Sequence, residues 1–183
     1  MRTPLGKALR QRFESRLQRD YPGFVRIPAV APGHRLYMWR VGDDLAFYIE
    51  LEVSNKYDSF NASVGFGVPG ALPRPYSPVT PESARHQPGS FRLAYLMRDP
   101  SSVPPVPYHD GWLELDPEVS PYVPHVSAPV ETCLAKLPML LDQIFERLAG
   151  YAFPFFAHVA TSRGHVLASF PLRERAAPAG SGR

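Results

Sequence analysis

Two carboxylates stand at a spacing that suits metal chemistry. Glu50 and Glu52 lie two residues apart in a segment with strand-like alternation, so both side chains project from one face of the predicted strand. Metal-dependent nucleases combine such acidic residues with a lysine, one spacer further on, that reaches the same metal-bound water. Here Ser54 occupies the lysine position and Lys56 lies just beyond. A metal-dependent hydrolase or nuclease using Glu50 and Glu52 is one alternative, and solvated residues on the open face of a sheet are the other.

The remaining reactive side chains form no recognisable catalytic or zinc-binding pattern. No Gly-x-Ser-x-Gly motif accompanies the adjacent His109 and Asp110. Cys133, the single cysteine, falls on the apolar stripe of a predicted helix, where a thiol behaves as a small buried group. Zinc-binding spacing is missing from the six histidines, which are His34, His86, His109, His125, His158 and His165. We therefore expect no cofactor and no metal, and the sequence favours a non-enzymatic role without deciding it.

Basic residues concentrate near the start of the chain. The net charge is +3, and Arg12, Arg16 and Arg19 recur at helical spacing on one side of the first predicted helix. Such a row of guanidinium groups can neutralise phosphates or meet an acidic protein. A nucleic-acid-binding helix is therefore a second alternative, although no base-reading motif accompanies it, and the solvated side of an amphipathic helix is the structural interpretation.

Prolines mark two long segments. The chain contains 22 prolines, about twice the average proportion, and most of them lie in residues 69–88 and 100–129. Proline lacks the backbone N–H that helices and central strands need, so both segments are predicted to be largely loop or extended chain. Aromatic residues among the prolines are typical anchors of protein interfaces. These loops either bind a partner or fold back over one side of the sheet.

The second Pro-rich segment holds the predicted partner-binding surface. Its aromatic and acidic residues surround a short predicted strand at 111–115. They are Tyr108, Asp110, Trp112, Glu114, Asp116 and Glu118. We expect this surface to bind another protein and to occlude a basic face of it.

Aromatic and β-branched residues predict an antiparallel hairpin. Residues 36–41 and 45–53 flank a three-residue loop, which pairs Tyr37 with Ile49 and Trp39 with Phe47 and gathers the large apolar residues on one face. Residues 60–68 and 91–97 continue the meander as two further strands, and a short strand is expected at 24–27. The other face of the hairpin then carries Met38, Arg40, Tyr48, Glu50 and Glu52.

Both ends of the folded part are predicted to be helical. Apolar residues recur every four positions through residues 4–20, and three-and-four spacing runs from Cys133 to a helix end at Gly150. Pro138 either kinks this helix or starts its main segment, and a shorter helix follows from near Pro154.

The predicted fold class is α+β. We expect an antiparallel meander of four to five strands, packed on one face by the N-terminal helix and the C-terminal helices, with long Pro-rich loops. Residues 1–172 are predicted to form a single domain and residues 173–183 a disordered tail.

The order of elements resembles a bacterial family, domain-of-unknown-function family 4304. The similarity lies in the leading helix, the aromatic hairpin at 36–53, the strand ending Val64-Gly65-Phe66-Gly67, and the closing helix that runs into Ala152-Phe153-Pro154-Phe155-Phe156. It covers residues 8–157 in outline. The resemblance implies a small bacterial protein that binds another protein, as an immunity protein or an accessory subunit of a toxin–antitoxin or defence system, and no catalytic residue is carried over.

The sequence predicts a cytoplasmic protein without membrane contact. Its apolar stretches fall short of the roughly 20 residues that span a bilayer. Arginines interrupt the start of the chain where a signal peptide would be apolar, and a single cysteine suits a reducing compartment.

Overall fold

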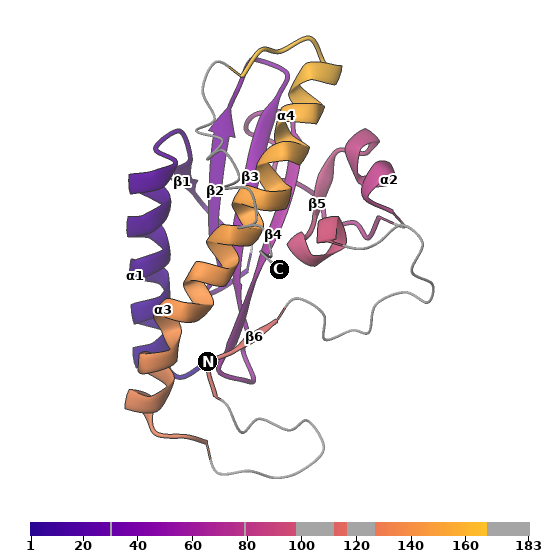
Figure 1. Cartoon of the computed structure of the whole chain (residues 1–183). Helices are drawn as coiled ribbons and strands as arrows, with labels where there is room; N and C mark the ends of the chain where they lie inside the picture. The colour runs from indigo at the N-terminus through magenta and orange to yellow at the C-terminus, as the bar shows by residue number, and fades with distance from the viewer. Residues whose placement is uncertain (30, 79, 98–111, 117–126, 168–183) are drawn as a thin grey trace, which may run out of the picture.

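The computed structural model describes residues 1–29, 31–78, 80–97, 112–116 and 127–167, and within these ranges it forms the predicted α+β fold (Figure 1). The strands are β1 (Val25–Ile27), β2 (Arg35–Arg40), β3 (Ala46–Val53), β4 (Ser59–Gly67), β5 (Gly89–Arg92) and β6 (Leu113–Glu114). The helices are α1 (Thr3–Asp20), α2 (Pro81–His86), α3 (Val130–Arg147) and α4 (Phe153–Ser162), with a 3₁₀ helix at Leu93–Met97 and a π-helical turn at Leu148–Ala152. The predicted tail at 173–183 lies outside the described residues.

The sheet is the antiparallel meander that the sequence predicts. Its strands follow in the order β1-β2-β3-β4-β5, and β6 pairs with the far end of β4. The predicted hairpin register is confirmed, since Tyr37 lies opposite Ile49 and Trp39 opposite Phe47. This register separates an inner face, which the helices cover, from an outer face that carries the polar residues of β3 and β4.

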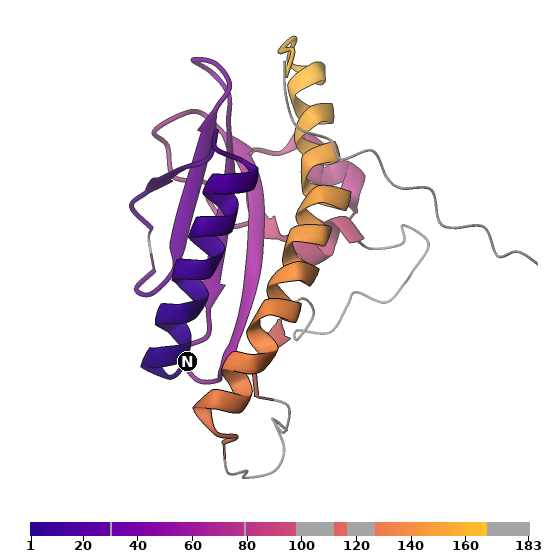
Figure 2. The same ribbon diagram turned by 60° about the vertical axis from the view of Figure 1, so that its left-hand side comes forward.

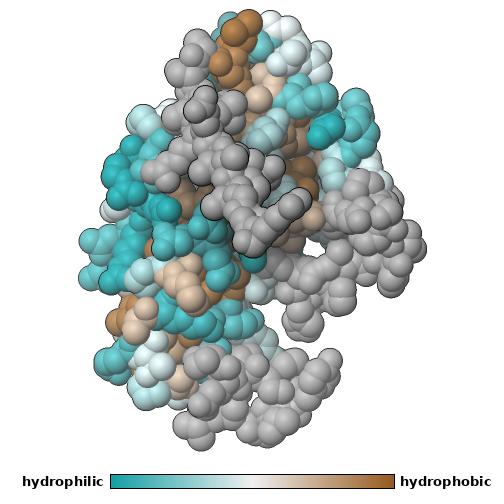
Figure 3. All heavy atoms as spheres, in the orientation of Figure 1, coloured by the Kyte–Doolittle hydropathy of each residue, from teal (hydrophilic) through white to brown (hydrophobic). Residues whose placement is uncertain are grey.

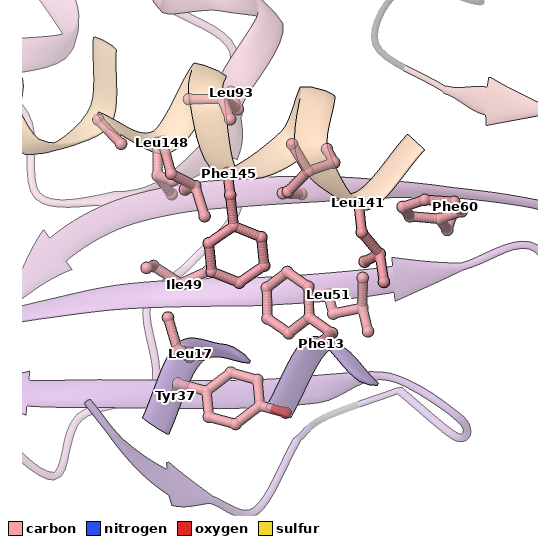
Figure 4. Packing of buried hydrophobic residues seen from close by; sticks show 14 of the residues in the cluster. Phe13, Leu17, Tyr37, Ile49, Leu51, Phe60, Leu93, Leu141, Phe145 and Leu148 are labelled. Carbon is pink, nitrogen blue, oxygen red and sulfur yellow. The ribbon is translucent and has the colours of Figure 1, made fainter. Parts of the chain in front are cut away.

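Helices α1 and α3 pack side by side on the inner face, with α4 continuing α3 along the sheet (Figure 2). The stripe at four-residue spacing on α1 is fully buried: Leu5, Leu9, Phe13 and Leu17. Aromatic rings join the layers, because the ring centroid of Phe13 lies 5.2 Å from that of Phe145 and 5.8 Å from that of Tyr37 (Figure 4). The predicted core is therefore the observed one. Within the described residues, no helix is long and apolar enough to cross a membrane.

The prediction of a strand through residues 91–97 is wrong beyond Arg92. Arg92 forms the last pair with β4, opposite Ser63, and the chain then turns into the 3₁₀ helix. Residues three apart lie above one another in such a helix, so Leu93 and Leu96 both turn toward the core. Alternate apolar residues suggested a strand, but packing follows the three-residue spacing.

The predicted helix end at Gly150 is also wrong. α3 runs through Pro138 to Arg147, and the chain passes through the π-helical turn directly into α4. The N–H of Phe153 donates to the carbonyl of Leu148, five residues back. The positive φ that ends a helix occurs at Gly164, with φ 76°, and not at Gly150.

The first Pro-rich segment folds back against the sheet where it is described. The hydroxyl of Tyr48 on the outer face lies 2.9 Å from the carbonyl oxygens of both Val68 and Ala71. Further on, the N–H of Tyr76 donates to the carbonyl of Ser90 at 2.8 Å. This part of the segment therefore covers the sheet.

Helix α2 was missed by the sequence analysis. Thr80 and Ser83 cap its N-terminus reciprocally, at 3.2 Å from the Ser83 N–H to Thr80 Oγ1 and at 3.0 Å from the Thr80 N–H to Ser83 Oγ. Thr80 followed by Pro81 at the first helical position was the available signal.

Candidate functional site

The two predicted carboxylates do project together from the outer face of β3, but other side chains already engage them. His34 Nδ1 lies 3.0 Å from Glu50 Oε1. Ser63 Oγ donates to the carboxylate of Glu52, and Arg92 Nε lies 3.8 Å from its other oxygen. We call these five residues the outer-face cluster. It is a network of ion pairs and hydrogen bonds, and within the described ranges no group of three or more His, Cys, Asp or Glu residues could hold a metal.

Asn61 lies beside this cluster and supports the sheet. It is 1% exposed, and its Oδ1 accepts a hydrogen bond of 2.7 Å from the N–H of Ala62. Ala62 falls between the stretch of β4 that pairs with β6 and the stretch that pairs with β5. The side chain thus satisfies the N–H of Ala62, a residue that pairs with β3 but with neither β5 nor β6 among the described strands.

The His34–Glu50 pair makes stability depend on pH. The hydrogen bond to Glu50 raises the pKa of His34 above its ordinary value, against the opposing effect of burial. Because the pKa of His34 is higher in the folded state than in the unfolded chain, the pair stabilises the fold fully below about pH 6.5. That contribution is lost as the pH rises through the raised pKa.

We expect Glu50→Gln to lower the free energy of unfolding by about 1 kcal/mol at pH 5.5 and by clearly less at pH 8.5. Urea unfolding of both proteins across this pH range measures the difference. Glu82→Gln is the matched control because its partner His86 lies on the surface of α2, and it should change stability by less than about 0.5 kcal/mol at every pH. A loss in Glu50→Gln that does not vary with pH would contradict the role of His34.

The three arginines predicted to share one side of α1 do line one groove, between α1 and α3. The groove has a volume of about 780 Å³, within the range of pockets that bind ligands or side chains. We call it the arginine groove. Its lining residues are Ala8, Gln11, Arg12, Ser15, Arg16, Arg19, Pro138, Leu141 and Asp142.

The charges of the arginine groove are only partly balanced. Arg16 pairs with Asp142 of α3, and its guanidinium carbon lies 4.4 Å from the centroid of the Phe145 ring. Arg19 pairs with Asp20 at 2.7 Å, which holds the pKa of that carboxyl below its usual value. Arg12 is exposed and forms no ion pair with any described residue. The groove therefore keeps a surplus positive charge at Arg12.

Apolar groups lie among these charges. Ala8, Pro138 and Leu141 contribute to the lining; Pro138 is exposed and Ala8 half-buried, whereas Leu141 belongs to the core. Figure 3 shows this face of the molecule, with hydrophobic atoms exposed between hydrophilic ones. The groove combines an apolar surface with guanidinium groups.

The predicted partner-binding segment is described only in part, since Tyr108, Asp110 and Glu118 lie outside the described residues. Asp116 is 1% exposed, and its Oδ2 accepts from the N–H of Ala128 at 3.1 Å, so it helps to hold the fold. Trp112 lies beneath the guanidinium of Arg92, and the carbonyl of Glu114 accepts from Lys136 Nζ at 2.7 Å. The described half of this segment is anchored to the sheet and to α3.

A partly buried polar network near the start of the chain escaped the sequence analysis. Asp58 accepts from the N–H of Arg2 at 2.6 Å and from its Nε at 2.5 Å. Arg2 also donates to the carbonyl of Ala128 at 2.7 Å and reaches Cys133 Sγ at 3.2 Å. Burial raises the pKa of the Cys133 thiol, which is therefore not an activated nucleophile. This network ties α1 to β4 and α3.

Together the fold and the groove define a two-layer α+β protein whose helical layer carries a basic, partly apolar groove. Comparison of the chain with models of protein families, with curated proteins and with solved structures finds no match. The resemblance to domain-of-unknown-function family 4304 stays a prediction.

Proposed function

We propose that this protein acts by binding another protein, and that the arginine groove accepts an acidic, amphipathic segment of that partner. One observation carries the proposal: Arg12 presents a guanidinium that has no ion pair with a described residue, in a groove that the apolar groups of Ala8 and Pro138 also line. A peptide that carries carboxylates on one side and apolar side chains on the other complements both features.

The same geometry favours a protein partner over a nucleic acid. Asp142 and Asp20 already offset the charges of Arg16 and Arg19, so few positive charges remain to displace counterions from a phosphate backbone. Phosphate contacts also make no use of apolar groups such as those that Ala8 and Pro138 supply. Nucleic-acid binding through Arg12, Arg16 and Arg19 is therefore the lesser candidate.

This proposal changes the chemistry expected of the partner. The segment around Trp112 suggested an acidic surface that occludes a basic partner, but Asp116 is buried in the fold. The arginine groove instead suits an acidic partner. An immunity-like or accessory role in a bacterial toxin or defence system remains the biological context that the family resemblance suggests, and cytoplasmic location remains part of that hypothesis.

The groove can be tested by site-specific crosslinking and affinity measurement. A photo-crosslinking residue at Gln11 or Ser15 should capture the partner in host cells, whereas the same residue at Leu72, an exposed position remote in sequence from the groove, should not. With the purified partner, Arg12→Glu should weaken binding at least about tenfold, or roughly 1.4 kcal/mol. Arg40→Glu is the matched control because Arg40 is exposed and pairs only with Asp43.

Two results would overturn the proposal. Equal affinity of the wild type and Arg12→Glu would remove the groove from the interface. Loss of the crosslinked complex after nuclease treatment would show that a nucleic acid, and not a protein segment, occupies the groove.

A further inference from the structure

A second basic site lies at the loop that joins β1 to β2. A pocket of about 440 Å³ opens there, lined by Arg26, Ile27, Pro28, Ala29, Ala31, Gly33, His34 and Arg35. Arg10 reaches the same loop from α1, with its Nη1 3.5 Å from the carbonyl oxygen of Gly33. We call this the β1–β2 pocket. Guanidinium groups thus approach it from α1, β1 and β2.

The charges at this pocket are poorly balanced. Arg10 and Arg35 form no ion pair with any described residue, and the Nη1 of Arg35 donates instead to the carbonyl of His34 at 2.9 Å. Arg26 has one carboxylate nearby, that of Glu14 at 3.8 Å. Burial and the charge of Arg35 together lower the pKa of Arg10, so these guanidinium groups are close enough to repel each other. An anion between them would relieve this repulsion.

Tyr37 lies on the inner face of the sheet and does not line this pocket. Tyr37 is fully buried, and its hydroxyl forms no hydrogen bond. Burial and the negative charge of Glu14 raise the pKa of Tyr37, against the smaller opposing effects of Arg26 and Arg35. Because Tyr37 is enclosed in the core, its hydroxyl takes no part in the pocket.

We infer that the β1–β2 pocket binds the phosphate group of a small phosphorylated ligand. Three guanidinium groups offer more donors than the two oxygens of a carboxylate can accept, whereas a phosphate monoester has three terminal oxygens and up to two negative charges. The apolar lining of Ile27, Pro28 and Ala29 leaves room for a small organic group beside the phosphate.

This inference does not depend on the arginine groove. Arg10 and Arg12 lie two positions apart on α1, which places them roughly 200° apart around the helix and therefore on different sides of it. A variant at one site should leave the other site intact, and this makes Arg12→Gln a matched control for Arg10.

Phenyl phosphate and benzoate form a suitable pair of probes, because they differ in the anionic group and share the ring. At pH 7.5 and constant ionic strength, phenyl phosphate should bind the full chain saturably in calorimetry and raise Tm by a few degrees. Benzoate should bind at least tenfold more weakly. Inorganic phosphate should compete with phenyl phosphate.

The Arg10→Gln/Arg35→Gln variant should lose this binding, and Arg12→Gln should keep it. Without ligand, the double variant should be no less stable than the wild type, because the repulsion between the two arginines is removed. If the double variant does not fold by circular dichroism, the single variants Arg10→Gln and Arg35→Gln should each weaken binding at least tenfold. Unchanged binding in the folded variants, or a wild type that responds to phenyl phosphate no more than to sodium chloride, would overturn the inference.

Discussion

Gly65→Ala should unfold this protein under mild conditions, with a loss of at least about 3 kcal/mol, or roughly 6–12 °C in Tm. Gly65 lies opposite Ser90 where β4 pairs with β5. A Cβ atom there would lie 1.9 Å from the carbonyl oxygen of Gly89 and 2.7 Å from the Cα of Ser90. Both neighbours are backbone atoms, so no rotamer change can make room and β5 would have to move. Thermal and urea unfolding would measure the effect.

Gly67→Ala provides the control on the same strand and the same face. The nearest atom to a Cβ at Gly67 would be Cε2 of Tyr48, at 3.8 Å, which is an ordinary contact. We expect no loss of stability, and a gain of up to about 1 kcal/mol because alanine restricts the unfolded chain. If the two variants were equally stable, the close approach of β5 to β4 would be refuted.

Asp58→Ala should lower the free energy of unfolding by about 2–3 kcal/mol, since it removes a buried carboxylate that accepts two hydrogen bonds from the half-buried Arg2. Asp58 is 7% exposed and accepts both the backbone N–H and Nε of Arg2. Arg2 keeps its contacts with Ala128 and Cys133, and Asp116 remains as the more distant negative charge that acts on it. Urea unfolding at low and at high salt measures the loss, which should persist in high salt because a buried pair is screened weakly.

Asp43→Ala is the control for this second variant. Its carboxylate also pairs with an arginine, Arg40, but the side chain of Asp43 is 98% exposed. Removing it should change stability by less than about 0.5 kcal/mol. A loss below about 1 kcal/mol in Asp58→Ala would show that the network around Arg2 contributes little to the fold.

The sequence predicts most of the sheet because its signals are local. Alternation in residues 36–53 admits one loop length that keeps Tyr37, Trp39, Phe47 and Ile49 on one face, and the structure has that register. Four-residue spacing likewise predicts α1, whose stripe from Leu5 to Leu17 is buried.

Where prediction failed, packing overrides the local pattern. The alternation of apolar residues predicts that the strand continues through Leu93. In the structure, pairing with β4 ends at Arg92 and the chain then forms a 3₁₀ helix. Gly150 has the residue type of a helix end, but it adopts no positive φ and the helix continues. The neighbouring residues alone predict neither the 3₁₀ helix after Arg92 nor the continuation of the helix through Gly150.

For the candidate sites too, some features follow from the local sequence pattern and others depend on the tertiary fold. The grouping of Arg12, Arg16 and Arg19 follows from helical periodicity alone, whereas their place in a groove depends on Pro138 and Asp142 of α3. Arg10 lies close to Arg35, and Arg2 pairs with Asp58, although the two residues of each pair are far apart in the sequence. No periodic pattern in the sequence links them. Such pairs become visible only once the strands and helices are placed.

The π-helical turn keeps one side of a long helical segment in phase with the sheet. Buried residues recur at intervals of four through this segment: Ile144, Leu148, Ala152, Phe156 and Ala160. In a uniform α-helix each interval of four advances about 40° around the axis, so these residues would drift by roughly 160°, almost to the opposite side. The extra residue of the turn takes up about 100° of that drift. Deletion of a single residue between α3 and α4 would therefore convert the π-helical turn into an ordinary α-helical turn and keep Phe156 and Ala160 in the core, whereas insertion of one further residue would rotate both by about 100°.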